Sequence, residues 1–140
     1  MNAPSQVVQV VGAGPAGLAA AITLASAGRR VMVYEAQREV GHRFGGDLQG
    51  LENWSTNVDV LEALRQAGIT TAFEKLPCSI GTAFDAWDGR HEVRSSEALF
   101  YLVDRGPGKG SLDSALLEQA LALGVEVRFG WRKTSLEGPG

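Results

Sequence analysis

The chain has 140 residues, 44% hydrophobic and 21% charged, so it is long and apolar enough to bury a core and too apolar for a disordered chain. Its net charge of -3 excludes a general attraction to nucleic acid or anionic lipid, because both require a basic surface. The single cysteine, Cys78, excludes a disulfide framework and a cysteine-based metal cluster. We therefore expect a cytoplasmic protein with no metal, no nucleic-acid partner and no transmembrane segment.

The first part of the chain predicts a strand, a helix and a second strand. Residues 6–11 are a β-rich apolar run, residues 15–27 are rich in Ala and Leu at helical spacing, and residues 30–34 are again β-rich. Pro15 suits the first helical position, and Gly28 suits the position just past the helix end, where a positive φ is favoured. These elements form a βαβ unit.

The middle of the chain departs from this pattern. Residues 37–57 are glycine-rich and weakly periodic, which indicates a long loop, and residues 58–66 have helical spacing. A turn at Asp88-Gly89 separates the first two of three β segments, and together they predict a small antiparallel sheet. These segments are residues 80–87, 91–95 and 99–103.

The last part returns to a helix and a strand. Ser111 is the expected N-cap of a helix over residues 112–123, Gly124 closes this helix, and residues 125–129 form a strand. The simplest assembly places this strand beside residues 30–34 as the third parallel strand.

The predicted fold class is therefore α/β, a Rossmann-like domain with a parallel sheet over residues 1–140. Residues 50–110 are expected to be an inserted excursion of one helix and antiparallel strands beside the parallel sheet.

A glycine-rich motif joins the first strand to the helix. Residues 10–17, VVGAGPAG, match G-x-G-x-x-G directly after a strand and at the start of a helix, as the motif requires. Gly12 allows the tight turn, Gly14 lets a pyrophosphate approach the backbone, and Gly17 lets the helix sit close on the strands. The helix start adds N–H donors and the positive end of its dipole. The motif predicts a diphosphate site formed by Gly12, Gly14, Pro15, Ala16 and Gly17.

An acidic residue ends the second predicted strand. Glu35 lies about twenty residues after Gly14, where a carboxylate accepts hydrogen bonds from the ribose hydroxyls of an ADP group and repels a 2′-phosphate. NADP is thus disfavoured at this site. The fingerprint alone does not separate FAD from NAD.

Residues 7–36, with GPAGL at 14–18 and VMVYEA at 31–36, resemble the amino terminus of FAD-dependent oxidoreductases with a glutathione-reductase-type flavin domain. Residues 40–47 are similar to the Gly/Arg-rich loop that follows the pyrophosphate and ribityl chain in that group. The resemblance implies FAD as the cofactor and an FAD/NAD(P)-binding domain over residues 1–140. It also implies that Ala36 and Arg43 belong to the cofactor site.

Residues 101–105, with the Leu-Asp pair at 112–113 and residues 120–127, are similar to the geranylgeranyl reductase and aromatic hydroxylase branch of that group. The resemblance implies that Arg105 reaches the flavin and that the strand around Val127 offers backbone groups to the adenine.

The activity that this resemblance implies is that of a flavin-dependent oxidoreductase acting on a small molecule, with an isoprenoid C=C reductase first. An FAD-dependent monooxygenase or an amine oxidase is the alternative, and a reduced donor such as NAD(P)H would supply the electrons. Residues 44–47, FGGD, lack the cysteine of many geranylgeranyl reductases. Family members continue well beyond residue 140, so we expect a truncated chain with an incomplete active site and name no catalytic residue.

Two other classes stay open at the level of sequence. An NAD-binding dehydrogenase module would bind NADH without flavin, and a non-catalytic fragment would retain flavin poorly and expose a sheet edge. The oligomeric state does not follow from the sequence.

Several conspicuous residues have plainer interpretations than a functional role. Residues 106–111 do not meet the phosphate-loop spacing, and Cys78 is expected to be a packed small residue. His42 and His91 are expected to be exposed. Trp54 either borders the cofactor or anchors a loop on the core.

Overall fold

A parallel sheet of three strands forms one layer of the molecule. The computed structural model describes residues 6–87 and 89–132. The strands lie in the order β1 (Val8–Val11), β2 (Val31–Tyr34) and β8 (Glu126–Arg128), and both pairings are parallel. The predicted third strand beside residues 30–34 is therefore confirmed. In chain order the elements are β1 (Val8–Val11), α1 (Pro15–Ser26), β2 (Val31–Tyr34), β3 (Leu48–Glu52), α2 (Val60–Gln66), β4 (Lys75–Cys78), β5 (Ile80–Phe84), β6 (Arg90–Arg94), β7 (Phe100–Asp104), α3 (Leu112–Ala122) and β8 (Glu126–Arg128).

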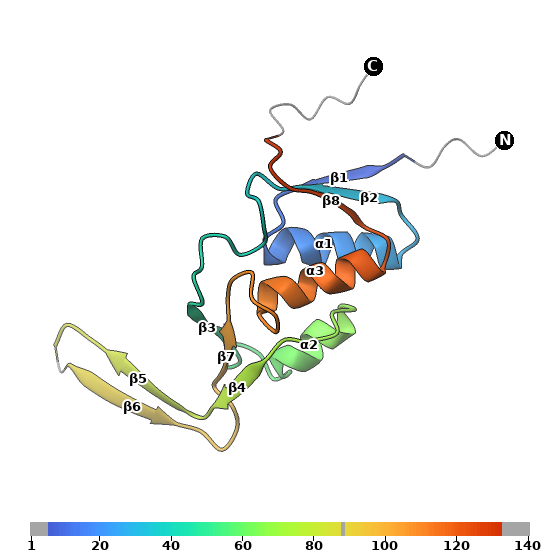
Figure 1. Ribbon diagram of the computed structural model, residues 1–140. Coiled ribbons are helices and arrows are strands. Elements are labelled where there is room, and N and C mark those ends of the chain that lie inside the picture. The colour runs from blue at the N-terminus through green and yellow to red at the C-terminus, as the bar shows by residue number, and fades with distance from the viewer. Residues whose placement is uncertain (1–5, 88, 133–140) are drawn as a thin grey trace.

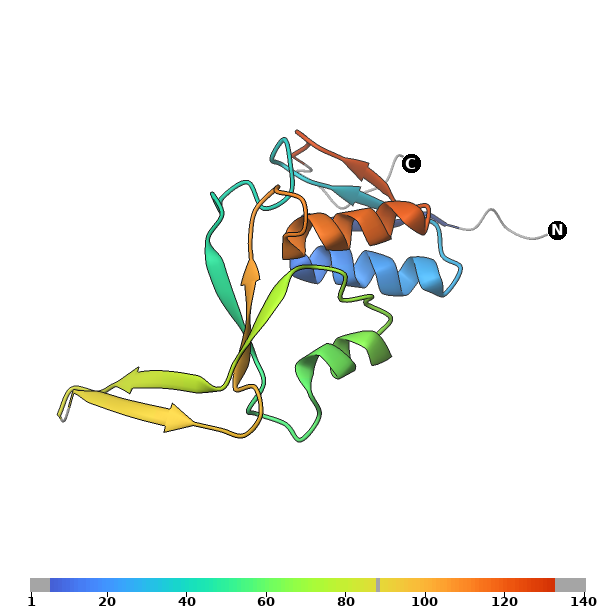
Figure 2. The same ribbon diagram turned by 60° about the horizontal axis from the view of Figure 1, so that its bottom comes forward.

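Helices α1 and α3 lie side by side against one face of this sheet (Figures 1 and 2). Strand β2 is central, so its alternate residues Val31 and Val33 are buried beneath the helices. Leu18 and Ile22 of α1 are fully buried, as is Ala120 of α3, because apolar residues three or four apart share one helix face. This α/β packing confirms the predicted fold class.

A second, antiparallel layer has the order β3-β7-β4, and helices α1 and α3 lie between it and the parallel sheet (Figures 1 and 2). Strands β5 and β6 form a separate hairpin, which projects away from the body (Figure 1). The single three-stranded sheet expected from β5, β6 and β7 is therefore wrong in its pairing. Residue 88, in the predicted turn between β5 and β6, lies outside the described residues.

Strands β3 and β4 lie where the sequence predicted no strand. Gly50 interrupts the apolar pattern of β3, and it lies beside the ring of Phe100 on β7, which is 3.5 Å from the position of an added Cβ, an ordinary van der Waals distance. Pro77 argues against a strand, but it lies in β4, an outer strand of its sheet, where a missing N–H is tolerated. Both strands depend on pairing with β7, which local sequence does not show.

The helix ends follow the predicted signals. Ser111 caps α3 by accepting a hydrogen bond from the Ser114 N–H, and Gly28 and Gly124 adopt φ values of 77° and 82° just after α1 and α3. Helix α2 starts at Val60, later than predicted, because Asp59 caps it. None of the helices within residues 6–87 and 89–132 has the length and apolarity to cross a bilayer.

Asp59 also joins α2 to the antiparallel layer. Its Oδ1 accepts hydrogen bonds from the backbone N–H groups of Leu61 and Glu62, and its Oδ2 accepts from the Tyr101 hydroxyl at 2.6 Å and from Asn53. The hydrogen bond from Tyr101, followed by those from the backbone, lowers the pKa of the Asp59 carboxyl and outweighs desolvation. The same contact raises the pKa of Tyr101.

We predict that Asp59→Ala lowers the free energy of unfolding by about 1 kcal/mol or more at pH 7, because it removes an N-cap and leaves Tyr101 without its acceptor. Because the pKa in the folded state is lowered, the ionised Asp59 stabilises the fold above its ordinary pKa of 3.8. This contribution is lost as the pH falls through the lowered pKa.

The measurement is urea unfolding of the wild type, Asp59→Ala, Asp59→Asn and the exposed-site control Glu118→Gln: Asp59→Ala tests the loss at pH 7, and Asp59→Asn tests the pH dependence between pH 7 and pH 2. The gap between the wild type and Asp59→Asn should close at the acid end. A gap that stays constant with pH would contradict the assigned linkage.

Candidate functional site

A cleft of about 610 Å³ opens at the carboxyl ends of β1 and β2. In open α/β sheets this edge is where ligands bind, because loops and helix N-termini converge there. The walls of the cleft come from the glycine-rich turn, the end of β2, the loop after it, and the segments after β7 and β8. The lining residues are Val11, Gly12, Ala13, Gly14, Pro15, Tyr34, Glu35, Ala36, Gln37, Glu39, Gly41, His42, Arg43, Phe44, Arg105, Asp113, Trp131 and Arg132.

The three glycines of the motif have separate structural roles. Gly12 has a φ of +95° and donates its N–H to the Tyr34 carbonyl at 2.7 Å. A Cβ on Gly17 would lie 2.0 Å from the Gly12 carbonyl oxygen, so only glycine lets α1 pack this close to the turn. A Cβ on Gly14 would meet nothing within 4 Å and would occupy open space at the cleft wall.

The amino end of α1 differs from those of the other two helices. Asp59 and Ser111 cap α2 and α3 with their side chains, whereas Gly14 provides no side-chain cap for α1. The first turn of α1 also has no acidic residue. The N–H groups and the positive dipole end of α1 therefore remain available to an anion in the cleft.

Glu35 is fixed in the cleft by the backbone on both sides. Its Oε2 accepts a hydrogen bond from the Ala13 N–H at 2.7 Å, and its Oε1 accepts one from the Gln37 N–H at 2.8 Å. These bonds connect the acid at the end of β2 to the glycine-rich turn. The carboxylate is thus held beside the glycine-rich turn that leads into α1.

The loop after β2 crosses the end of β7 with its backbone in direct contact. A Cβ on Gly41 would lie 2.6 Å from the Cα atom of Gly106, and a Cβ on Gly106 would lie 2.6 Å from the Phe44 carbonyl oxygen. Gly106 also has a φ of +124°. The ring of Phe44 covers the Arg105 guanidinium, with its centroid 4.2 Å from Cζ.

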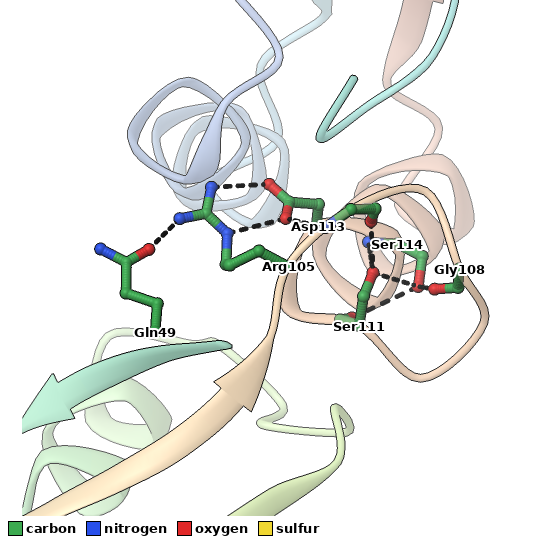
Figure 3. Close-up of polar contacts among 7 residues, drawn as sticks. Gln49, Arg105, Gly108, Ser111, Asp113 and Ser114 are labelled. Atoms are coloured by element: carbon green, nitrogen blue, oxygen red, sulfur yellow. Dashed lines mark hydrogen bonds and ion pairs between the residues drawn. The ribbon is translucent and has the colours of Figure 1, made fainter. Parts of the chain in front are cut away.

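Arg105 is only 6% exposed and forms a bidentate ion pair with Asp113 at the start of α3 (Figure 3). Its Nε donates to Asp113 Oδ2 at 2.8 Å and its Nη2 to Asp113 Oδ1 at 3.0 Å, while Nη1 donates to the Gln49 side chain. Asp113 also accepts the Gly106 N–H at 3.0 Å. Sequence reasoning missed Asp113 and Gln49 as partners of Arg105.

The predicted cofactor residues divide into two groups. Most of them line the cleft: Gly12, Gly14, Pro15, Glu35, Ala36, Arg43 and Arg105. Ala16, Gly17 and Val127 do not line it, and Val127 lies within β8 opposite Val33. Trp131 lines the cleft and was not singled out from the sequence, where it follows the last strand with no motif around it.

Of the conspicuous residues that the sequence did not assign to the cofactor site, His42 lines the cleft, whereas His91 and Trp54 do not. His42 is exposed at the rim, 3.3 Å from Glu39, and His91 pairs with Asp85 on the exposed hairpin. Trp54 is 65% exposed, so it does not anchor a loop on the core. Asn53 connects this loop instead, because its side chain donates to the Ala98 carbonyl and accepts from the Val60 N–H. In the part of the chain that the structure describes, no cluster of three His, Cys, Asp or Glu side chains could hold a metal ion.

Comparison with known proteins matches the part of the chain that contains the glycine-rich turn and Glu35. Residues 10–50 match the family model described as an NAD(P)-binding Rossmann-like domain. A Cereibacter sphaeroides protein named "Putative glutamate synthase (NADPH) small chain" is 39% identical over 116 residues, which are 76% of this chain and 26% of that protein. Putrescine oxidase from Kocuria rosea is 54% identical over 52 residues, 37% of this chain and 9% of the oxidase. L-amino-acid oxidase from Demansia vestigiata is 49% identical over 55 residues, 39% of this chain and 10% of that oxidase.

Solved structures match nearly the whole chain. The tetrameric form of 2-methyl-3-hydroxypyridine-5-carboxylic acid oxygenase has a TM-score of 0.66 and 23% identity, over 91% of this chain and 32% of the oxygenase. CabE, an aromatic hydroxylase from angucycline biosynthesis, has a TM-score of 0.59 and 26% identity, over 91% of this chain and 24% of CabE. A flavoprotein/dehydrogenase from Cytophaga hutchinsonii has a TM-score of 0.62 and 23% identity, over 96% of this chain and 33% of that protein.

The fold and the cleft define the class of protein: this is an α/β Rossmann-like domain with a parallel sheet and small antiparallel sheets, and its residues 10–50 match the NAD(P)-binding Rossmann-like family model. More particularly, its similarity is to the corresponding domain of oxygenases, hydroxylases and oxidases. The chain spans about a quarter of the length of the glutamate synthase relative and a quarter to a third of these solved structures.

We predict that Asp113→Ala lowers the free energy of unfolding by about 3 to 5 kcal/mol, because it leaves the Arg105 charge buried without its partner. Chemical denaturation at pH 7 measures this loss. The double variant Arg105→Met/Asp113→Leu should recover most of it, since an apolar pair removes the uncompensated charge. A single-variant loss below about 1 kcal/mol, the range of an exposed pair, would contradict the burial of this ion pair.

Proposed function

We propose that this chain binds FAD in the cleft and forms the FAD-binding part of a flavin-dependent oxidoreductase. The observation that carries the proposal is the combination of an uncapped α1 terminus and a fixed carboxylate, Glu35, in one cleft. A diphosphate fits the first feature, and the ribose hydroxyls of an ADP group fit the second. The same carboxylate disfavours a 2′-phosphate, so NADP fits this position less well.

The charges of the cleft suit a dinucleotide. Arg43 and Arg132 line the cleft and form no ion pair with other described residues, so they are available to phosphate oxygens. Arg105 is different, because Asp113 already balances its charge. We propose that Arg105 holds the Phe44 loop along the cleft and contacts the cofactor with its remaining N–H groups.

Bound FAD would supply the redox chemistry, and the protein would supply binding, orientation and electrostatics. Glu35 and the first turn of α1 would hold the ADP half. The loop over residues 41–46, packed on Gly106, would border the path toward the flavin half.

Within flavin enzymes, we favour the monooxygenase or hydroxylase class. CabE, an aromatic hydroxylase, and the pyridinecarboxylic acid oxygenase superpose over 91% of the chain, far more than residues 10–50. The two amine oxidases match only 37% and 39% of the chain, so that class comes second. The expected isoprenoid reductase has the support of the motif residues alone, and the comparisons favour the hydroxylase alternative over it.

An NAD-binding dehydrogenase module remains the rival from another class, since the matching family model describes NAD(P) binding. The two hypotheses share the ADP site and differ in the second half of the ligand. Titrations with FAD and with NADH therefore separate them.

We predict that Gly14→Val weakens FAD binding by more than about tenfold, or about 1.4 kcal/mol, while the fold is kept. The new side chain would project into the open space of the cleft, and the backbone at Gly14, with φ −75° and ψ 175°, accepts a β-branched residue. Flavin fluorescence titration measures the affinity, and circular dichroism checks the fold.

Gly108→Val is the matched control, because a Cβ on Gly108 also meets nothing within 4 Å and Gly108 does not line the cleft. This variant should bind FAD like the wild type. Equal affinity of Gly14→Val and the wild type would place the flavin elsewhere. A wild type that binds NADH and not FAD would replace the proposal with the dehydrogenase module.

A further inference from the structure

The carboxyl edge of the parallel sheet arranges three features in a fixed order. Strands β1, β2 and β8 are parallel and adjacent in that order, so their carboxyl ends meet at one edge (Figure 1). The glycine-rich turn follows β1, Glu35 follows β2, and Trp131 lies three residues after the end of β8. In an ADP group the diphosphate, ribose and base are also joined in that order.

Trp131 is hydrogen-bonded to the backbone of the segment that contains Glu35. Its N–H donates to the Glu35 carbonyl at 2.9 Å, and the Gly130 N–H donates to the Gln37 carbonyl at 2.9 Å. Gly130 has a φ of +73°, which turns the chain after β8. The Trp131 backbone therefore lies beside that of Glu35, at the end of the sheet where β8 flanks β2, and Trp131 lines the cleft.

The indole is oriented by its neighbours yet half open to the cleft. The ring of Tyr34 lies 6.0 Å away at a tilted angle of 55°, and the Arg128 guanidinium lies 5.7 Å from the Trp131 ring centroid. Trp131 nevertheless remains 53% exposed. A large aromatic surface that is fixed before binding costs little conformational entropy when a flat ligand stacks on it.

We infer that Trp131 is the aromatic wall that stacks on the adenine of the bound dinucleotide. This inference rests on the proposed function, because it assumes that the diphosphate lies at the α1 terminus and the ribose at Glu35. A purine base attached to that ribose reaches past β2 toward the end of β8. Stacking suits Trp131 because each base has a π face, so no particular hydrogen-bond donor is required.

The test measures ADP binding to the wild type, Trp131→Ala and Trp131→Phe. The expected result is a loss of about tenfold in ADP affinity for Trp131→Ala, typical of one lost base stack, and a smaller loss for Trp131→Phe. Ribose 5-diphosphate, which lacks the base, should compete equally well in all three proteins. Trp87→Ala is the matched control, because Trp87 is 93% exposed and does not line the cleft.

A spectroscopic readout detects the stack itself. The chain has three tryptophans, so Trp54→Phe/Trp87→Phe leaves Trp131 as the only indole. ADP should quench its fluorescence to saturation, and ribose 5-diphosphate should not. Quenching of this single indole also shows contact in a case where Trp131→Ala fails to fold.

The outcomes separate the two levels of the inference. If the wild type binds FAD and ADP, but Trp131→Ala binds ADP equally well and the single-indole protein shows no quenching, the stacking role is wrong and the proposed function stands. If the wild type binds neither FAD nor ADP, the proposed function fails and the stacking role fails with it.

Discussion

The ion pair between Arg105 and Asp113 joins the two layers of this molecule at the edge of the cleft. Arg105 follows the last residue of β7, in the antiparallel layer, and Asp113 lies in the first turn of α3, under the parallel sheet. Gln49 of β3 and the ring of Phe44 complete the surroundings of the guanidinium. A shift of either layer would separate these groups, so this contact fixes where the antiparallel layer sits relative to the cleft.

Because the Arg105–Asp113 ion pair is buried, it fixes the relative position of the two layers more than it adds net stability to the fold. Removing two charges from water costs free energy that their attraction recovers only with good geometry, and here the geometry is bidentate. The Gly106 N–H, in the segment after β7 that packs against the loop over residues 41–46, adds a third hydrogen bond to Asp113. Phe44 of that loop covers the Arg105 guanidinium, whose charge Asp113 already balances.

The sequence predicts the parallel half of the molecule well, because its signals are local. The glycine motif, Pro15, Gly28 and the Ser111 cap each act within a few residues, and the structure places each as expected. The antiparallel half was predicted less well. Strand β3 contains Gly50 and β4 contains Pro77, so both read as irregular chain and become strands only by pairing with β7.

The candidate site shows the same contrast between residues marked by local sequence signals and residues brought together from distant positions. Glu35 and the glycines were found because they belong to one motif with one spacing, whereas the partners of Arg105 come from distant or unmarked positions. Gln49 is 56 residues away from Arg105 along the chain, and Asp113 resembles an ordinary first-turn acid. Trp131 was missed for the same reason, since only the sheet order brings it beside Glu35.

The measurement that tests the central claim most directly is the visible absorbance spectrum of the purified chain after FAD is added and unbound ligand is removed by desalting. The cleft described here predicts that the two visible bands of oxidised flavin remain with the protein, and that excess ADP displaces them. A colourless protein after desalting, together with NADH binding in a parallel titration, would contradict the assignment of this cleft to FAD.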